Sequence, residues 1–293
     1  RDVLIFHAAG LTPLLIALRE DIRRDLGIRL ITEGSGSQAA CRKVTELGRS
    51  CDILMLADNA LVTSLLSPEC DWRLDFANDA VVLGVGIRAP RISDAEQDWV
   101  PVLLDSKTRL ARVDENQGPI GYRTLLTWKL KEQKGYADLY ERLMAKYGDR
   151  TVDHVSRLTP LLKNGEIDYA FVYRSICIAS DIRFISLDGA VNLGAAHADY
   201  SRAKVQFQAL TAGRGNTVTI HGAPITWTLT MPNHAEADLK HAIKVASYLL
   251  TEKRDSLKRH GFMPLEKPQF YGNAGVFPMF AEFAEYAGIL DRN

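Results

Sequence analysis

Three short segments combine small residues with the expected start of a helix: "AAGLT" at 8–12, "GSGSQ" at 34–38 and "GPIGYR" at 118–123. The first turn of a helix leaves backbone N–H groups without intrahelical partners, and these groups attract anions. In the second segment the hydroxyls of Ser35 and Ser37 add further donors. Each segment alone also fits an ordinary turn. Their shared position at the ends of expected strands favours a site that binds an anion.

Familiar nucleotide and hydrolase motifs are absent from these segments. No G-x-x-x-x-G-K-[ST] is present, and G-x-G-x-x-G fails at Ala39 and follows the second expected strand instead of the first. The nucleophile motif G-x-S-x-G is absent as well. Neither a bound nucleotide nor a serine nucleophile is therefore expected.

Groups that could catalyse a reaction are scattered along the chain. His7 lies in an apolar stretch, where a buried structural histidine is the more common role, and nothing places Asp75 and Asp79 in one site. The four cysteines show no C-x-x-C spacing, so we expect buried thiols, or a disulfide if the protein is exported. We expect a protein that is not an enzyme. Catalysis on the same fold is an alternative, and rapid alkylation of Cys41 at neutral pH would favour it.

The composition is that of a globular protein without a preference for nucleic acid. Of the 293 residues, 46% are apolar and 25% are charged, and 36 basic side chains balance 36 acidic ones. Proteins that bind nucleic acid usually carry a basic excess. No apolar stretch is long enough for a membrane helix. Because the chain begins with Arg1 and not with Met, we expect a trimmed or mature form, so the lack of a targeting signal does not indicate the cytosol.

Strands and helices alternate in the expected order of elements. Short apolar runs at 2–10, 28–34 and 51–58 predict buried strands, and segments with helical spacing separate them. This order predicts a doubly wound, mostly parallel α/β sheet, in which ligands bind at the carboxyl ends of the strands. The segments at 8–12 and 34–38 occupy such ends.

A second α/β set begins after a long expected strand at 79–87, and a long strand returns at 223–232. We therefore expect two lobes joined by a two-stranded hinge. Residues 1–84 with 223–293 form the first lobe, and residues 85–222 form the second. A cleft between two lobes is a common place for a small ligand.

Several segments resemble one protein family in chain order. They are "LIFHAAGLTPLL", "GSGSQAACRKVTELGRSCDILMLAD", "GPIGYR", "GEIDYAFVYRS" and "FISLDGAVNLG". Together they resemble the periplasmic molybdate/tungstate-binding proteins of ABC importers, above all the archaeal branch, from residue 3 to about residue 264. The resemblance implies the type II periplasmic-binding fold, an α/β fold with two lobes. The aromatic tail from about residue 270 to residue 293 lies outside it.

The resemblance also implies which residues bind the ligand. Ser37 matches a serine ligand, Ile120 a backbone N–H donor and Tyr173 a tyrosine hydroxyl. Gly10 stands where the family has its first serine, and Thr12 is the candidate to replace that hydroxyl. The complete expected set is Ala9, Gly10, Thr12, Ser35, Ser37, Ile120, Val155 and Tyr173, with Val155 at the start of a helix.

Two departures concern the carboxylates that bind the metal atom in the archaeal branch. Gly118 and Val172 occupy the positions of its aspartate and glutamate. Those carboxylates expand the coordination of the metal atom, so their loss predicts a tetrahedral oxyanion that N–H and O–H donors hold, with no protein ligand on the metal itself.

We expect an extracytoplasmic solute-binding protein that carries molybdate, tungstate or sulfate to an ABC permease. No cofactor is expected, and the protein should be a monomer in the periplasm or outside the cell, with a membrane anchor on a segment ahead of Arg1 as one mode of attachment. The substitutions at Gly10, Gly118 and Val172 leave an alternative: the same fold with another small ligand or a metal ion.

Overall fold

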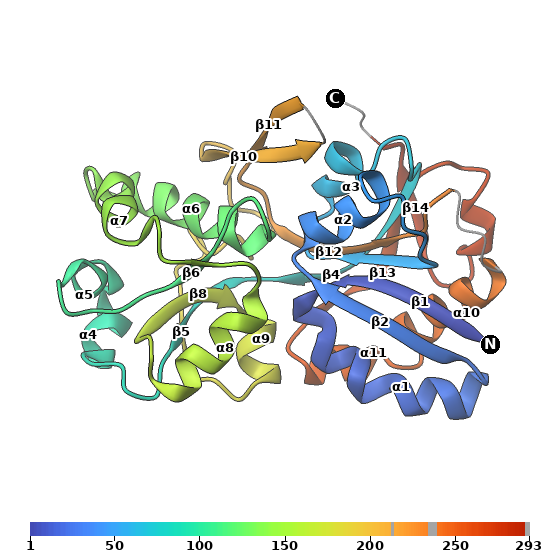
Figure 1. The fold of residues 1–293 in the computed structure, drawn as a ribbon, viewed down its shortest axis with the longest axis horizontal. Coiled ribbons are helices and arrows are strands. Elements are labelled where there is room, and N and C mark those ends of the chain that lie inside the picture. The colour runs from blue at the N-terminus through green and yellow to red at the C-terminus, as the bar shows by residue number, and fades with distance from the viewer. Residues whose placement is uncertain (212–213, 234–238, 291–293) are drawn as a thin grey trace. The chain divides into compact units, whose positions relative to one another are not determined.

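The structure is a computed structural model that describes residues 1–211, 214–233 and 239–290. The chain divides into two compact units, which Figure 1 shows with the chain coloured from blue to red. Unit 1 consists mainly of Arg1–Asn78 and Thr226–Asn293. Unit 2 consists mainly of Asp79–Ala209 and Gly215–Ile225.

Unit 1 is built around a mixed sheet with the strand order β14-β13-β4-β12-β3-β1-β2. Its elements are β1 (Asp2–Ala8), the 3-10 turn η1 (Ala9–Leu11), α1 (Thr12–Leu26), β2 (Arg29–Ser35), α2 (Ser37–Thr45), β3 (Ile53–Leu56), α3 (Ala60–Leu65), β4 (Trp72–Asp79), β12 (Ile225–Thr230), α10 (Leu239–Leu250), α11 (Arg254–Arg259), β13 (Met263–Gly272), η2 (Phe277–Met279) and β14 (Glu285–Gly288). β1 runs parallel to β2 and β3, whereas β12 runs antiparallel to β3.

The first helix shows how local sequence produces this unit. The side chains of Leu14, Leu15, Leu18 and Ile22 are buried, as the helical spacing predicts. α1 ends at Gly27, whose φ of 68° is left-handed. Glycine adopts this conformation without a steric penalty, so the helix ends where the sequence indicates.

Unit 2 has a smaller sheet with the order β8-β5-β9, in which β5 is antiparallel to both neighbours. Its elements are β5 (Val81–Val85), α4 (Ile92–Gln97), α5 (Trp99–Leu104), β6 (Arg112–Val113), α6 (Pro119–Glu132), α7 (Leu139–Tyr147), β7 (Thr151–Val152), α8 (Val155–Asn164), β8 (Tyr169–Tyr173), α9 (Arg174–Ala179), β9 (Phe184–Ser186), β10 (Lys204–Thr211) and β11 (Arg214–His221). A parallel bridge between Leu110 and Tyr169 places the parallel pair β6–β7 beside β8.

The two units share one topological pattern. Unit 1 contains the order β2-β1-β3-β12-β4, and unit 2 has β7-β6-β8-β5-β9 once the Leu110 bridge is included. In each, three parallel strands are followed by one antiparallel strand. β5 is the first strand after the chain enters unit 2 between Asn78 and Asp79, and β12 begins where the chain returns to unit 1 between Ile225 and Thr226. The mixed α/β architecture is confirmed, and these crossing strands explain why neither sheet is entirely parallel.

The C-terminal region completes unit 1. Trp72 of β4 stacks on Phe270 with ring centroids 5.4 Å apart and meets Phe280 at 4.8 Å. Phe270 and Phe280 are both fully buried. Phe270 and Phe280 of the aromatic tail are therefore part of the core of unit 1, because aromatic rings of this size contribute much of the buried apolar area.

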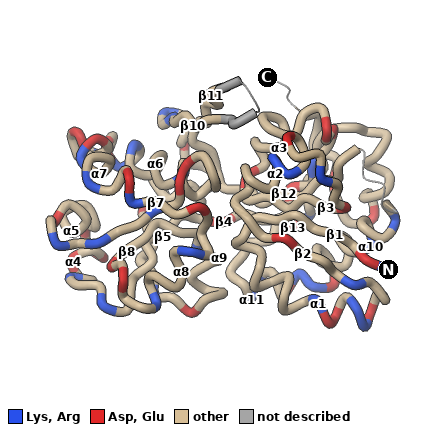
Figure 2. Tube along the Cα trace, in the orientation of Figure 1, with Lys and Arg blue, Asp and Glu red and all other residues tan. Residues whose placement is uncertain are grey.

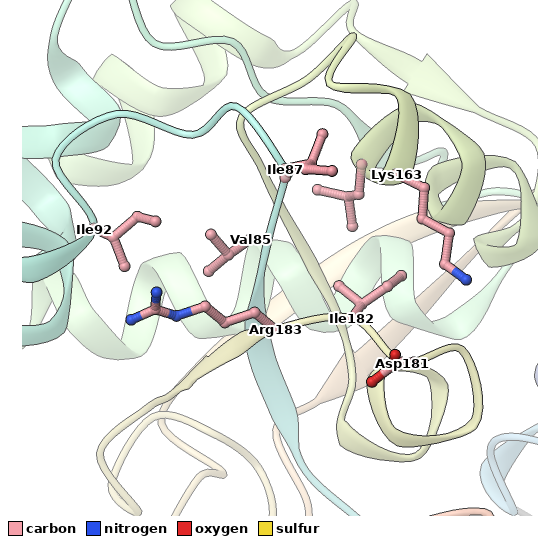
Figure 3. Close-up of a pocket in the computed structure, with 9 residues that line it drawn as sticks. Val85, Ile87, Ile92, Lys163, Asp181, Ile182 and Arg183 are labelled. Atoms are coloured by element: carbon pink, nitrogen blue, oxygen red, sulfur yellow. The ribbon is translucent and has the colours of Figure 1, made fainter.

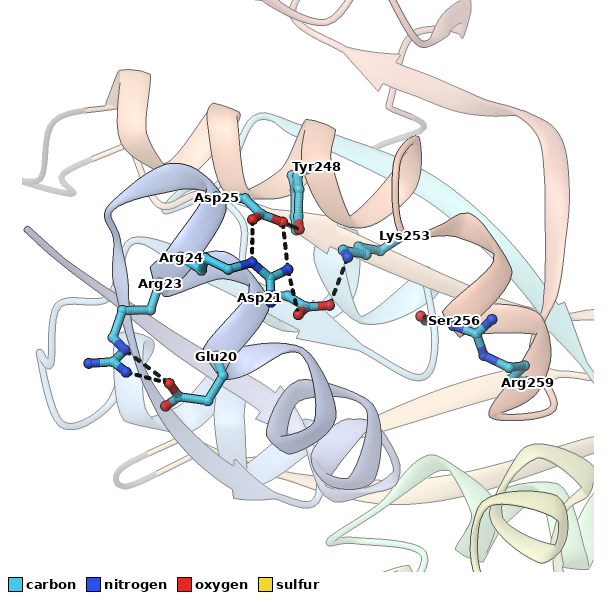
Figure 4. A network of polar contacts seen from close by, with 9 residues as sticks. All are labelled: Glu20, Asp21, Arg23, Arg24, Asp25, Tyr248, Lys253, Ser256 and Arg259. Atoms are coloured by element: carbon cyan, nitrogen blue, oxygen red, sulfur yellow. Dashed lines mark hydrogen bonds and ion pairs between the residues drawn. The ribbon is translucent and has the colours of Figure 1, made fainter.

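Polar contacts also connect this region with α1 (Figure 4). Lys253 donates to Asp21 over 2.7 Å, and Tyr248 donates to Asp25 over 2.5 Å. Arg24 and Tyr248 lower the pKa of Asp25 to about 2. Such contacts at the surface stabilise a fold only modestly.

The sequence at 235–261 predicts a single helix, which the structure divides into two. α10 ends at Leu250 and α11 begins at Arg254, because the N–H of Lys253 bonds to the carbonyl of Tyr248 in a wide turn. Residues 234–238, where that helix was expected to start, lie outside the described residues. Every helix in the described part of the chain is too short or too polar to span a membrane. Basic and acidic residues are interspersed along the chain in each unit (Figure 2).

Candidate functional site

In unit 1 the expected binding residues lie at the carboxyl ends of neighbouring parallel strands. Ala9 and Gly10 follow β1 in the buried turn η1, and Thr12 begins α1. Ser35 ends β2, and Ser37 begins α2. β1 pairs with β2 on one side and with β3 on the other, so these loops share one edge of the sheet. This is the edge at which parallel α/β sheets bind ligands.

The two serines differ in what their hydroxyls do. Ser37 is fully buried, and its Oγ accepts a hydrogen bond of 3.1 Å from the N–H of Ala57, the residue after β3. Its own proton must therefore go to a different acceptor. Ser35 donates its proton to the carbonyl of Gly36 over 3.2 Å. Ser37 is consequently the better donor for an anion.

His7 lies against this loop, and the close contact requires a glycine at position 34. A Cβ added to Gly34 would lie 2.9 Å from Cε1 of His7 and 3.0 Å from Oγ1 of Thr12. The Nδ1 of His7 lies 2.9 Å from the carbonyl of Ala8, and burial lowers the pKa of the imidazole below its usual value. The expected burial of His7 is confirmed.

A cluster of charges holds the strand that leads into the loop. Glu33 accepts hydrogen bonds from Arg49 at 2.6 Å and from Lys43 at 3.1 Å. These partners hold the pKa of Glu33 below its usual value. Both cations also lie over the ring of Phe6, at 4.8 and 4.9 Å from its centroid. The "RKVTELGR" segment thus holds the end of β2, where the loop begins, through Lys43 and Arg49.

In unit 2 the expected residues again follow parallel strands. Ile120 lies in the first turn of α6 after β6, Val155 begins α8 after β7, and Tyr173 ends β8. The turn before α6 is tight: a Cβ added to Gly121 would lie 2.6 Å from the carbonyl oxygen of Asp114. Ile120 is buried, and its N–H belongs to the turn that a helix leaves without internal partners.

Tyr173 has a partner that the sequence interpretation missed. Nη1 of Arg123, in α6, donates a hydrogen bond of 2.7 Å to the hydroxyl of Tyr173. Both residues are buried, with 3% and 2% of their surfaces exposed. The available signal was a basic residue inside "GYRTLLTWKL", since almost all of α6 is buried and an arginine there needs a specific reason.

The segment after Tyr173 is fixed by Asp79. This carboxylate is fully buried and accepts hydrogen bonds from Oγ of Ser175 at 2.5 Å and from the N–H of Ala80 at 2.8 Å. Asp75 instead contacts Asn59 at 2.8 Å and Arg73 at 3.1 Å. These hydrogen bonds connect Asp75 with residues of unit 1 and Asp79 with residues of unit 2.

Val172 and Tyr173 lie on opposite faces of β8, because side chains alternate along a strand. A Cβ added to Gly84 would lie 3.1 Å from Cγ2 of Val172 and 3.2 Å from Cδ1 of Leu162 in α8. Val172 thus packs in the apolar core on the side of α8, the helix that Val155 begins. Ile120, Arg123 and Tyr173 form a group on the side of α6.

Two cavities of unit 2 are lined by residues other than these candidates. A cavity of about 290 Å³ is lined by Val85, Ile87, Lys163 and Arg183 (Figure 3). Val85 pairs with Tyr169, at the opposite end of β8 from Tyr173. A second cavity, of about 570 Å³, lies around Arg109, Lys146 and Arg150. The candidate site is therefore defined by its donors and not by either cavity.

The cysteine thiols give no indication of a catalytic role. All four cysteines are buried and free. Burial raises the pKa of Cys51, Cys70 and Cys177 to about 12 and raises that of Cys41 as well. Buried thiols with raised pKa values are poor nucleophiles. Among the described residues, no group of three or more His, Cys, Asp or Glu side chains is arranged to hold a metal ion.

Comparison with known proteins identifies the family of this chain. The model of a family described as bacterial extracellular solute-binding protein matches residues 3–263. A solute-binding protein of Petrotoga mobilis is 29% identical over 274 residues, covering 91% of this chain and 84% of that protein. A molybdate/tungstate-binding protein of Pyrococcus abyssi is 26% identical over 304 residues, covering 92% of this chain and 87% of that protein.

A solved structure of similar fold is the periplasmic molybdate-binding protein of Azotobacter vinelandii. It has a TM-score of 0.62 at 16% identity and covers 89% of this chain and 98% of its own. This likeness supports the type II periplasmic-binding fold. The chain belongs to the family of bacterial extracellular solute-binding proteins, a family of binding proteins and not of enzymes.

Proposed function

We propose that this protein binds a tetrahedral oxyanion of the molybdate and tungstate type outside the cytoplasm and delivers it to an ABC permease in the membrane. Relatives of this chain carry names that refer to molybdate, tungstate or molybdenum transport. The family of extracellular solute-binding proteins supports the location.

The observation that carries the proposal is the repeated placement of donors. In each unit, buried N–H or O–H groups follow the carboxyl ends of parallel strands: Ala9, Gly10 and Ser37 in unit 1, and Ile120 and Tyr173 in unit 2. An oxyanion has only acceptor oxygens, so a set of donors matches it. We propose that the two donor sets together surround one anion in a cleft between two lobes, which close at the strands where the chain crosses.

The absence of carboxylates from the candidate positions supports a four-oxygen anion. Gly118 is the extended residue before α6, and Val172 is buried in an apolar core. Neither supplies an oxygen to a metal atom. A carboxylate that did not bond to the metal would repel a dianion, so donors without acidic neighbours suit a tetrahedral oxyanion better.

Isothermal titration calorimetry with molybdate, tungstate, sulfate and phosphate tests the proposal. Heat of binding and a rise in the unfolding temperature are expected with at least one of the first three anions, because a ligand of the folded state stabilises it. Neither signal with any oxyanion would refute the proposal. Gly10 lacks the hydroxyl of the family serine, so the test includes sulfate as well. Binding of sulfate alone would indicate a sulfate carrier instead.

A further inference from the structure

We propose that His7 belongs to the anion site: it takes up a proton when the oxyanion binds, so that the anion and one proton are held together. This inference rests on the proposed function and adds a residue that the expected set of binding residues does not contain. It predicts that the affinity for the oxyanion depends on pH.

The expected binding residues of unit 1 carry no formal charge. Thr12 and Ser37 have neutral hydroxyls, and the other candidates there supply backbone groups or a further hydroxyl. Lys43 and Arg49 are positive, but they pair with Glu33 at 3.1 and 2.6 Å. An anion in a buried site without a compensating charge is costly. A group beside these donors that can become positive would therefore strengthen binding of a dianion.

His7 lies beside these donors. It pairs in register with Gly34 of β2 and Met55 of β3, and it is only 1% exposed. A Cβ added to Gly34 would lie 2.9 Å from Cε1 and 3.5 Å from Nε2 of His7, and 3.0 Å from Oγ1 of Thr12. The Cε1–Nε2 edge of the ring and the candidate hydroxyl of Thr12 therefore meet next to the backbone of Gly34.

The two ring nitrogens of His7 have different roles. Nδ1 lies 2.9 Å from the carbonyl oxygen of Ala8, which can only accept, so Nδ1 carries a proton. Nε2 has no hydrogen-bond partner among the residues that the structure describes. In the neutral ring Nε2 presents a lone pair, which an oxyanion repels, whereas in the protonated ring it is a donor. Protonation thus turns His7 into a group that stabilises the anion.

Burial keeps the ring neutral before the anion arrives. It lowers the pKa of His7, the hydrogen bond to Ala8 raises this pKa in part, and the positive charge of Lys43 lowers it again. A negative charge within about 4–6 Å favours the charged imidazole and raises its pKa. The complex then holds more protons than the free protein, so the affinity rises as the pH falls through the pKa of His7 in the complex.

The neighbouring elements offer no other negative charge for this proton. β2, β3 and α2 pack against β1, and η1 follows it. Neither η1 nor Ile53–Leu56 of β3 contains a titratable side chain. The titratable side chains of β2 and α2 are Arg29, Glu33, Cys41, Arg42 and Lys43. Burial raises the pKa of Cys41 and keeps its thiol neutral, and Glu33 is engaged by Lys43 and Arg49. The charge that holds a proton on His7 must therefore come from the anion.

Isothermal titration calorimetry tests the inference with molybdate, or with sulfate if only sulfate binds. Titrations at about pH 6 and about pH 8, in two buffers of different ionisation enthalpy, give the affinity and the number of protons taken up. The wild type should bind about 3- to 10-fold more tightly at the lower pH and take up protons there, because the anion raises the pKa of His7. His7→Gln should have the same affinity at both pH values and take up none.

Two other histidines serve as controls. His221→Gln changes an exposed histidine and should keep the pH dependence of the wild type. His154→Gln changes the residue before Val155, the candidate at the start of α8, and should keep it as well. A pH dependence that persists in His7→Gln, or that is lost in His154→Gln instead, overturns the inference.

The wild type alone also provides a test. The same affinity at both pH values overturns the inference while the proposed function stands. If His7→Gln does not fold, an NMR titration of the His7 ring in the wild type decides, and a pKa that saturating anion leaves unchanged overturns the inference. Absence of oxyanion binding at both pH values refutes the proposed function itself.

Discussion

The candidate site is defined by how single hydrogen bonds are directed. Ser37 and Tyr173 each accept a hydrogen bond from a group that can only donate, whereas Ser35 uses its proton within its own loop. Hydroxyls of the same type therefore differ in whether they are suited to donate to an anion. The hydrogen bonds that they already make determine this more than their position in a motif does.

Ser37→Ala should weaken oxyanion binding by about 1–3 kcal/mol and lower stability by a similar amount, because it removes a donor and leaves the buried N–H of Ala57 without this acceptor. Ser35→Ala is the matched control from the same loop and should have a smaller effect on both. Calorimetry and urea unfolding measure the two quantities. Equal effects of the two substitutions would contradict the assignment of Ser37.

His7 should make the stability of the protein sensitive to acid. Burial lowers its pKa below the ordinary 6.5, so the unfolded chain takes up a proton at a higher pH than the folded one does. Stability is therefore fully present above about pH 6.5 and falls as the pH decreases toward the folded pKa.

Urea unfolding at about pH 7.5 and about pH 5.5 should show a smaller pH-dependent loss for His7→Gln than for the wild type. His221→Gln, a change at an exposed histidine, is the control and should behave as the wild type does. The same pH dependence in His7→Gln and the wild type would exclude His7 as the source.

At the scale of elements, contacts outside the donor set support the site loops. The Glu33 cluster fixes the end of β2, Asp79 fixes the start of α9 through Ser175, and a close approach to Asp114 requires glycine at position 121. Rigid support of this kind reduces the ordering cost of binding, so the loops can hold donors in place before the anion arrives.

Gly34→Ala should destabilise unit 1 by about 1–3 kcal/mol, because the added methyl group would collide with one imidazole ring and one hydroxyl. The clash involves His7 at 2.9 Å and Thr12 at 3.0 Å, so anion affinity should fall as well. Gly189→Ala is the control, since its added Cβ would meet only Ala195 at 3.8 Å. Thermal unfolding of both variants checks the difference, and a neutral Gly34→Ala would show that the loop can move away.

At the scale of the whole molecule, two units with the same strand order each receive one crossing strand. The repetition explains why similar donor positions recur in both units. Two-lobed binding proteins commonly close around their ligands by rotation at such crossings. The proposed function therefore predicts a change in shape upon binding.

Small-angle scattering should show a smaller radius of gyration after the preferred oxyanion is added at saturating concentration. The control is the Ser37→Ala, Tyr173→Phe double variant at the same anion concentration, which should keep the unliganded value. An unchanged radius for a wild type that binds the anion would indicate a site within one unit.

The sequence alone determined the alternation of strands and helices, the family resemblance and the positions of Ser37, Ile120 and Tyr173 near element ends. These features are local, because hydrophobic periodicity and turn residues act over a few neighbouring positions. The lobe boundaries at 84/85 and 222/223 and the identity of the oxyanion remain predictions.

Only the tertiary structure decided the pairs that give these residues their roles. Arg123 and Tyr173 are 50 positions apart, Ser37 and Ala57 are 20 apart, and the tail ring of Phe270 packs against Trp72. Such pairs depend on strand order and on which helix covers which face of a sheet. Local periodicity contains neither of these. The contact of Arg123 in α6 with Tyr173 therefore became apparent only once β8 was placed beside α6.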